Sequence, residues 1–132
     1  MANGLYALGF QAIFSGSIDF LTATIKAALV TNSYTPNLLT DQYYSTISAD
    51  VIGSPVALSS VAFSGFNLTA ANTTQSSVSS GHTITYIVIY MDTGSSSTSP
   101  LLAIFDTMYG LPYSTNGGNF TIFWPGGVVL QG

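Results

Sequence analysis

The sequence predicts a mainly β protein, either an antiparallel β-sandwich or a jelly-roll-like fold, with a short N-terminal helix or arm. Two observations predict it. The chain is strongly apolar and almost uncharged, with 47% hydrophobic and 5% charged residues, and its apolar residues alternate in short segments separated by Gly, Ser, Pro and Asn clusters. A chain of 132 residues fits one domain. We therefore expect a single domain over 1–132, with an arm or helix in 1–16 and the sandwich in 17–132.

The first segment has helical spacing. Its apolar positions are Leu5, Leu8 and Ala12 on one face, with Phe10 and Phe14 four positions apart beside it. Gly16 follows as a helix stop. The spacing predicts a short helix or helical turn.

Residues 17–31 predict one or two strands, because Ile25, Ala27 and Leu29 alternate with the side chains between them. The polar residues 32–53 predict a connection with one helical turn after Pro36, capped by Asn37 or Thr40.

Every strong signal after residue 51 is β. In 61–70 the apolar parity changes at Ser64-Gly65, which predicts a β-bulge at Gly65. Residues 83–91 are apolar on both faces and predict a central strand between two layers. Residues 99–106 and 119–124 predict two further strands.

Few residues can carry chemistry or charge. The titratable side chains are Asp19, Asp41, Asp50, Asp92, Asp106, Lys26 and His82, and the chain has no Arg, Glu or Cys. With one cation it cannot neutralise a nucleic-acid backbone, so we expect no nucleic-acid partner. The scattered aspartates show no EF-hand spacing, and the sequence predicts no metal site and no cofactor. Low charge weakens repulsion between copies and favours association.

The apolar composition raises the question of a membrane. No apolar run approaches ~18 residues, and no positively charged leader precedes the first apolar segment. We expect no membrane partner and folding in the cytoplasm where the chain is made.

Asp92-Thr93-Gly94-Ser95 has the form of the catalytic loop of aspartic proteases. That chemistry needs two carboxylates sharing a proton, which a short chain obtains by dimerising. However, the motif lies late in the chain, and no convincing partner segment follows it. The alternative is a turn between two strands, with Gly94 at positive φ and Asp92 accepting from backbone amides ahead of it. We favour the turn and predict no catalytic residues.

His82, the single imidazole, lies in a predicted turn that enters a strand, and neighbouring serines are too common to indicate a catalytic pair. Five tyrosines fall in predicted loops: Tyr34, Tyr43, Tyr44, Tyr109 and Tyr113. Such tyrosines can stack on sugars or anchor protein interfaces. Equally, they can cap the ends of the core.

Several short motifs lie in the N-terminal and C-terminal parts of the chain. They are Met1 to Asn3, Leu5-Tyr6, Ile18 to Phe20, Asp92 to Gly94, Ser99 to Leu101, Gly110 to Pro112, and Asn116 to Gly118. With them the sequence resembles a family of small proteins encoded by tailed bacteriophages and prophages. The resemblance covers roughly two thirds of the chain and is weak over 46–82. Typical members carry more charged residues where this chain has Leu21, Ala23 and Ala28.

The resemblance implies a virion structural protein, and size and β-rich character favour a capsid decoration or cement protein. The resemblance further implies that the protein binds the major capsid protein and lies on the capsid surface of the virion. It also implies a homo-oligomer, either a dimer or a trimer. We expect the arm Leu5 to Phe14 to dock on a neighbour or on the shell, with interface residues Leu5, Tyr6, Phe10, Phe14, Tyr109 and Tyr113. The alternatives are a tail, neck or fibre module that binds host glycans through loop tyrosines, and, more remotely, a dimeric aspartic protease.

Overall fold

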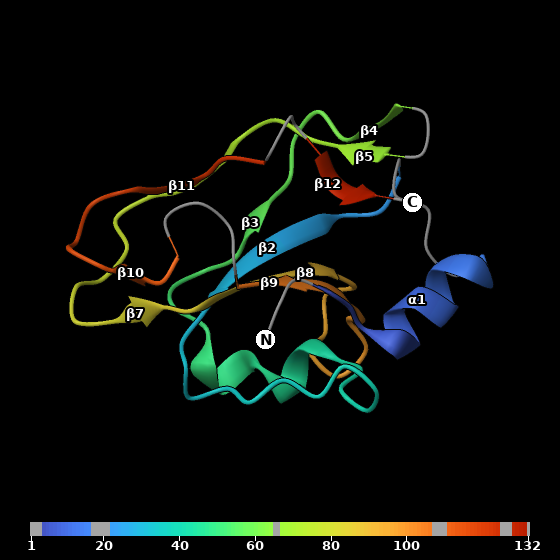
Figure 1. The fold of residues 1–132 in the computed structure, drawn as a ribbon, viewed down its shortest axis with the longest axis horizontal. Helices are drawn as coiled ribbons and strands as arrows, with labels where there is room; N and C mark the ends of the chain where they lie inside the picture. Colours follow the sequence, from blue (N-terminus) through green and yellow to red (C-terminus); the bar gives the residue numbers. More distant parts are fainter. Residues whose placement is uncertain (1–3, 17–21, 65–66, 107–110, 125–127, 132) are drawn as a thin grey trace.

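The protein is mainly β and antiparallel, as predicted (Figure 1). The computed structural model describes residues 4–16, 22–64, 67–106, 111–124 and 128–131. A five-stranded sheet in the order β1-β9-β8-β2-β3 lies at the centre. Three smaller sheets, β4/β5/β12, β6/β11 and β7/β10, complete a sandwich-like architecture.

The elements follow the chain in this order: β1 (Gly4–Leu5), α1 (Ala7–Phe14), β2 (Ile25–Val30), the 3-10 helices η1 (Tyr44–Thr46) and η2 (Ser48–Asp50), β3 (Val56–Ala57), β4 (Ala62–Ser64), β5 (Asn67–Thr69), β6 (Thr73–Gln75), β7 (Thr83–Ile84), β8 (Tyr86–Met91), β9 (Leu101–Phe105), β10 (Tyr113–Ser114), β11 (Phe120–Ile122) and β12 (Val128–Gln131).

Strand β8 is the middle strand of the central sheet, which confirms the predicted central strand for residues 86–91, whereas residues 83–84 form β7 in a separate sheet with β10. It pairs with β2 from Ile25↔Met91 to Val30↔Tyr86 and with β9 on its other side. Its side chains from Ile87 to Tyr90 are all buried. Both faces of the sheet are therefore covered, and the apolar residues divide into two cores.

The first core, which we call the main core, lies between the central sheet and the small sheets. Ile87 and Ile89 of β8 point into it, and Leu68, Ile84 and Ile122 come from the covering strands. In Figure 1 β4, β5, β11 and β12 lie above the central sheet, and β7 and β10 lie at its left. Strands that are short on their own thus bury one face against a longer sheet.

The second core, which we call the tyrosine core, lies on the opposite face of the sheet. Val88 and Tyr90 of β8 point into it, and Tyr6, Tyr34 and Ile47 cover them. Its cover is the connection between β2 and β3, including η1 and η2, which runs below the sheet in Figure 1. The predicted helical turn after Pro36 is present, because the Asp41 amide donates to the Asn37 carbonyl and the Asn37 side chain accepts from the Leu39 amide.

The N-terminal segment is part of the domain. Strand β1 pairs with β9 at the sheet edge, and α1 packs against β9 through Gly9. A Cβ at Gly9 would overlap the Leu101 carbonyl oxygen, so only glycine allows this close approach. The expected helix is confirmed, but it is held by the domain's own core and is not a free arm.

Residues 61–70 do not form one bulged strand. Strands β4 and β5 pair with each other as a hairpin, with Ala62 opposite Thr69 and Ser64 opposite Asn67. Gly65, where we expected the bulge, lies outside the described residues. A hairpin reverses the chain between Ser64 and Asn67, and this reversal explains the change of parity that we attributed to a bulge.

The one α-helix in the described ranges, α1, has 8 residues and is too short to cross a bilayer, and no longer apolar helix occurs there.

Candidate functional site

An exposed aromatic pair on α1 is the most prominent apolar feature at the described surface. Phe10 is 44% exposed and Phe14 is 76% exposed. Their ring centroids lie 4.5 Å apart with the planes tilted by 42°. Exposed phenyl rings in contact present a continuous apolar surface, which is a typical anchor for another protein.

Tyr6 fixes the position of this helix. It directly precedes α1, is fully buried, and its amide donates to the Leu102 carbonyl at 3.0 Å. Next to it, the Ala7 amide donates to the Leu38 carbonyl at 2.8 Å. The start of α1 is thus tied both to β9 and to the connection that covers the tyrosine core.

A chain of hydrogen bonds runs from Tyr6 to the surface. The Tyr34 hydroxyl donates to Asp41 Oδ2 at 2.6 Å, and the Asn37 amide donates to the same oxygen at 2.9 Å. The Tyr6 and Tyr34 hydroxyl oxygens lie 2.8 Å apart. Because a phenol has one proton and Tyr34 gives its own to the carboxylate, Tyr6 donates to Tyr34.

Burial raises the pKa of both tyrosines well above the ordinary value of 10.0. For Tyr34 the hydrogen bond to Asp41 raises the pKa further. Both phenols are therefore neutral donors at physiological pH, and the chain of hydrogen bonds is a fixed support for α1.

The structure places the predicted interface residues in different environments. Leu5, which is 39% exposed, lies at the surface together with Phe10 and Phe14. Tyr6 is wrong as a surface residue, because its side chain fills the tyrosine core. Tyr113 is half-buried and its ring packs against Phe120 at 4.9 Å. Tyr109 lies outside the described residues.

The described loop tyrosines mainly close the core, which was the alternative reading of their position. Tyr34 is buried, and Tyr44 stacks on Tyr90 with a centroid distance of 4.5 Å and an interplanar angle of 26°. The Tyr90 ring covers one face of Tyr44, which is half-buried, and the buried Tyr34 ring is closed to a sugar.

Asp92 lies in a turn between β8 and β9. Its Oδ1 accepts a hydrogen bond from the Gly94 amide at 2.8 Å, and Gly94 has φ +90°. Its Oδ2 lies 2.6 Å from Lys26 Nζ. The bond to Lys26 and the Gly94 amide hold the pKa of this carboxyl below its ordinary value. Asp92 is thus an ionised turn residue whose partners in the described chain include no carboxylate, and the turn interpretation is confirmed.

His82 directly precedes β7, in the predicted turn. It is exposed, and no serine in the described part of the chain bonds to its ring. Across the described ranges, no group of three or more His, Cys, Asp or Glu side chains comes together as a metal site would require.

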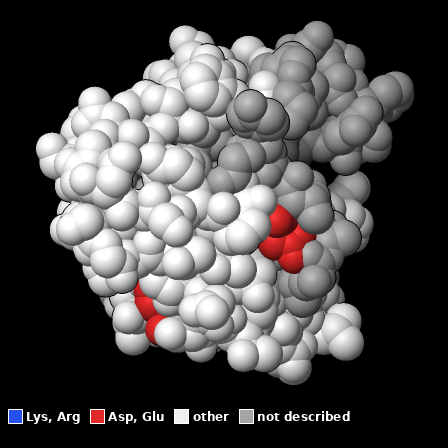
Figure 2. Space-filling model, turned by 60° about the vertical axis from the view of Figure 1, so that its left-hand side comes forward, with Lys and Arg blue, Asp and Glu red and all other residues white. Residues whose placement is uncertain are grey.

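The surface carries little charge. Figure 2 shows one face that is almost entirely uncharged among the described residues, with acidic atoms in two small areas. The net charge of −4 arises from five aspartates and one lysine. A surface of this kind offers hydroxyl groups and apolar atoms to a partner rather than a charge pattern.

Comparison with known proteins adds no relative: no family model, no curated protein and no solved structure matches the chain.

Proposed function

We propose that this protein is a structural component of a tailed-phage particle that binds the outer surface of the capsid, as a decoration or cement protein. Its partner is the major capsid protein, and it acts as a homo-oligomer, a dimer or trimer. It works by burying surface and not by chemical conversion of a substrate.

The observation that carries the proposal is the rigidly held aromatic pair Phe10 and Phe14. The exposed rings lie on a helix whose start is tied to β9 and to Leu38 by backbone hydrogen bonds. A preorganised anchor loses little conformational entropy when it binds. Specific contacts of this type bury more than about 1,000 Å², and repetition over a lattice adds avidity.

The sequence resemblance supports the virion context. The motifs that carry it lie partly in turns of clear structural use: Asp92 to Gly94 joins β8 to β9, and Asn116 to Gly118 contains an amide-capped turn. In that turn the Gly118 amide donates to Asn116 Oδ1 at 3.0 Å, and Gly117 has φ +86°. These motifs therefore specify architecture, in agreement with a structural role.

Copy number is the first test. Quantitative mass spectrometry of purified particles should find the protein in hundreds of copies, comparable to the major capsid protein. A few tens of copies would contradict capsid decoration and favour the tail, neck or fibre alternative. Absence from particles would reject a virion role.

A second test addresses the aromatic pair. Heads that lack the protein should bind the wild type saturably, and Phe10→Ser with Phe14→Ser should weaken this binding at least about tenfold. Phe123→Ser is the matched control, because Phe123 is an exposed phenylalanine (59%) that directly follows β11 and is not part of α1. Unchanged binding by the double variant, or equal loss in the control, would reject α1 as the anchor.

A further inference from the structure

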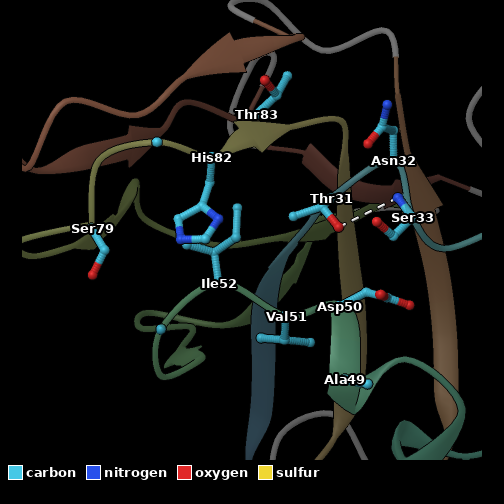
Figure 3. Close-up of a pocket in the computed structure, with 12 residues that line it drawn as sticks. Thr31, Asn32, Ser33, Ala49, Asp50, Val51, Ile52, Ser79, His82 and Thr83 are labelled. Atoms are coloured by element: carbon cyan, nitrogen blue, oxygen red, sulfur yellow. Dashed lines mark hydrogen bonds between the residues drawn. The ribbon is translucent and has the colours of Figure 1, made fainter.

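A polar hollow of about 480 Å³ lies where β2 ends beside β7 (Figure 3). Three segments line it: residues 31–33, residues 49–53, and residues 79 and 81–83. In Figure 1 β7 lies at the left and α1 at the right, so the hollow and the aromatic pair are at opposite ends of the molecule. The volume falls within the range of small-molecule sites.

Backbone hydrogen bonds fix the walls of the hollow. The Thr31 amide donates to the Asp50 carbonyl at 3.0 Å, and the Ile52 amide donates to the Leu29 carbonyl at 2.8 Å. On the other wall, the amide and the hydroxyl of Thr115 both donate to the His82 carbonyl, at 2.9 and 3.1 Å. The site is preformed, so a ligand would not have to order it.

The functional side chains of the hollow are not used by the fold. The carboxylate of Asp50, the amide of Asn32 and the ring of His82 make no hydrogen bond with any residue in the described ranges, although Asp50 is half-buried. By contrast, the carboxylates of Asp41 and Asp92 each accept a hydrogen bond from a backbone amide. Polar groups gathered without a structural partner are available to a ligand.

The lining has two sides of different character. In Figure 3 Asp50, Asn32 and Ser33 lie on one side, while the His82 ring points toward Ile52 on the other. One side therefore offers acceptors and donors, and the other offers the exposed ring of His82, which points toward the buried Ile52. A pyranose matches this arrangement, because its hydroxyl edge is polar and its C–H face is apolar.

The charged residues of the lining argue against an anion or a metal ion as the ligand. No Lys or Arg lines the hollow, so an anion would meet the Asp50 carboxylate without a compensating cation. The single lysine, Lys26, is paired with Asp92. A metal ion lacks ligands, because the only His and Asp of the hollow are His82 and Asp50.

We infer that this hollow binds a neutral saccharide. Asp50 and Asn32 bind ring hydroxyls, and the sugar lies against the exposed ring of His82. The inference goes beyond capsid binding and uses none of the loop tyrosines. A decoration protein with this site would carry many weak sugar sites on each particle, where repetition converts millimolar affinity into useful adhesion.

A neighbouring hollow of about 590 Å³ provides an internal control. It shares Gly53 and Ser79 with the first and is lined by further serines and by Lys26. Its buried acceptor, Gln75 Oε1, makes no hydrogen bond to a described residue but is closed to the surface. This hollow lacks a carboxylate, and we expect it to bind no sugar.

The test uses the full chain labelled with ¹⁵N and titrated with D-glucose, D-galactose, D-mannose and N-acetyl-D-glucosamine up to about 50 mM. At least one sugar should give saturable shifts at the amides of Asn32, Gly81 and His82. Inorganic phosphate at the same concentration should give none. Absence of saturable shifts with all four sugars, or shifts with phosphate alone, would overturn the inference.

Variants then assign the contacts. Asp50→Asn and Asn32→Ala should each weaken binding at least about tenfold, since each removes hydrogen bonds made only to the ligand. Asn72→Ala, an exposed asparagine outside the hollow, and Ser54→Ala in the neighbouring hollow should leave affinity unchanged. Spectra without sugar report whether each variant is folded. Equal affinity in Asp50→Asn and wild type would reject the site, and this result would leave the capsid proposal untouched.

Discussion

The two faces of the central sheet are covered in different ways. The main core is closed by short paired strands that contribute aliphatic and aromatic side chains, and no buried tyrosine is among its described residues. The tyrosine core is closed by an irregular connection, and Tyr6, Tyr34 and Tyr90 supply much of its volume. An irregular segment has backbone N–H and C=O groups that are not paired within a helix or sheet and need other hydrogen-bond partners. A tyrosine suits such a cover, because its ring fills space while its hydroxyl group bonds a polar partner.

This difference shows how a chain with 5% charged residues builds a polar cover for one face of its sheet. Tyr34 reaches Asp41, so the hydrogen-bond chain starts at a fully buried phenol and ends at a half-buried carboxylate. The stability of the main core depends on the packing of its apolar side chains. The stability of the tyrosine core also depends on the protonation state of its phenols. The two cores should therefore fail under different conditions.

Alkaline pH should produce the largest effect and should act on the tyrosine core. Burial raises the pKa of Tyr6, Tyr34 and Tyr90 above 10.0, the value at which they ionise in the unfolded chain. Above pH 10 the unfolded state releases these protons and the folded state does not, so stability is full below pH 10 and is lost as pH rises. Each tyrosine should cost about 1.4 kcal/mol per pH unit, or ~4 kcal/mol for three at pH 11.

Urea unfolding at pH 8 and pH 11 measures this loss. Tyr34→Phe should reduce the difference between the two pH values, because it removes one of the three buried phenols. Equal stability of the wild type at both pH values would show that the phenols are not protected by the fold.

Ile89→Ala should give the next largest effect, and it acts on the main core. Ile89 is fully buried in the central strand, and its truncation leaves a cavity between the sheets. We expect a loss of about 3 kcal/mol in the free energy of unfolding at pH 8, and about 1 kcal/mol for Ile89→Val. The alkaline loss should remain as in the wild type, because the two cores are separated by the sheet. A change in the alkaline loss would contradict the independence of the cores.

Gly9→Ala tests the helix that joins the two cores. Tyr6 at the start of α1 lies in the tyrosine core, while Ala12 and Ile13 pack against the main core. The added methyl group would push α1 away from the Leu101 carbonyl, at a cost of about 2 kcal/mol. Thermal unfolding measures the effect, with Gln11→Ala on the exposed side of the helix as a nearly neutral control. Equal melting temperatures of Gly9→Ala and wild type would disprove the close approach.

Asp92→Asn should have the smallest effect. Lys26 and Asp92 are each about a quarter exposed, so solvent screens the pair and we expect a loss of about 0.5 kcal/mol at pH 7. Because Lys26 lowers the folded pKa of Asp92 below 3.8, this contribution is present above pH 3.8 and is lost as pH falls through the folded value. Chemical unfolding should show a larger difference between variant and wild type at pH 7 than at pH 3.

The features that depend on local pattern could be predicted from the sequence. Residues 83–91 are apolar on both faces, which indicates a covered central strand, and the Phe10 to Phe14 spacing indicates a helix. The position of Asp92 in a turn could be predicted from its neighbours, because an aspartate carboxylate can accept a hydrogen bond from the amide two residues later, here Gly94. The hairpin of β4 and β5 was missed because a bulge and a reversal both change the apolar parity.

The features that depend on long-range contact could not be predicted. Nothing near Tyr6 indicates that its hydroxyl meets Tyr34, 28 positions later. The saccharide site combines Asn32 from the turn after β2, Asp50 from η2 and His82 from the segment before β7. Each of these segments resembles many other Ser- and Thr-rich segments of this chain, so the sequence contains no local signal for the hollow.

The pairing of β1 with β9 has a consequence for synthesis. Gly4 pairs with Ile104, so the edge strand must wait for a partner made 100 residues later (104 minus 4). At translation rates of about 5–20 residues per second, the first segment remains without its sheet for about 5–20 s. During this time Tyr6 and the aromatic pair are open to other nascent chains and to chaperones. Tyr6, which the finished domain buries, thus adds to the apolar surface that can aggregate while the chain is still on the ribosome.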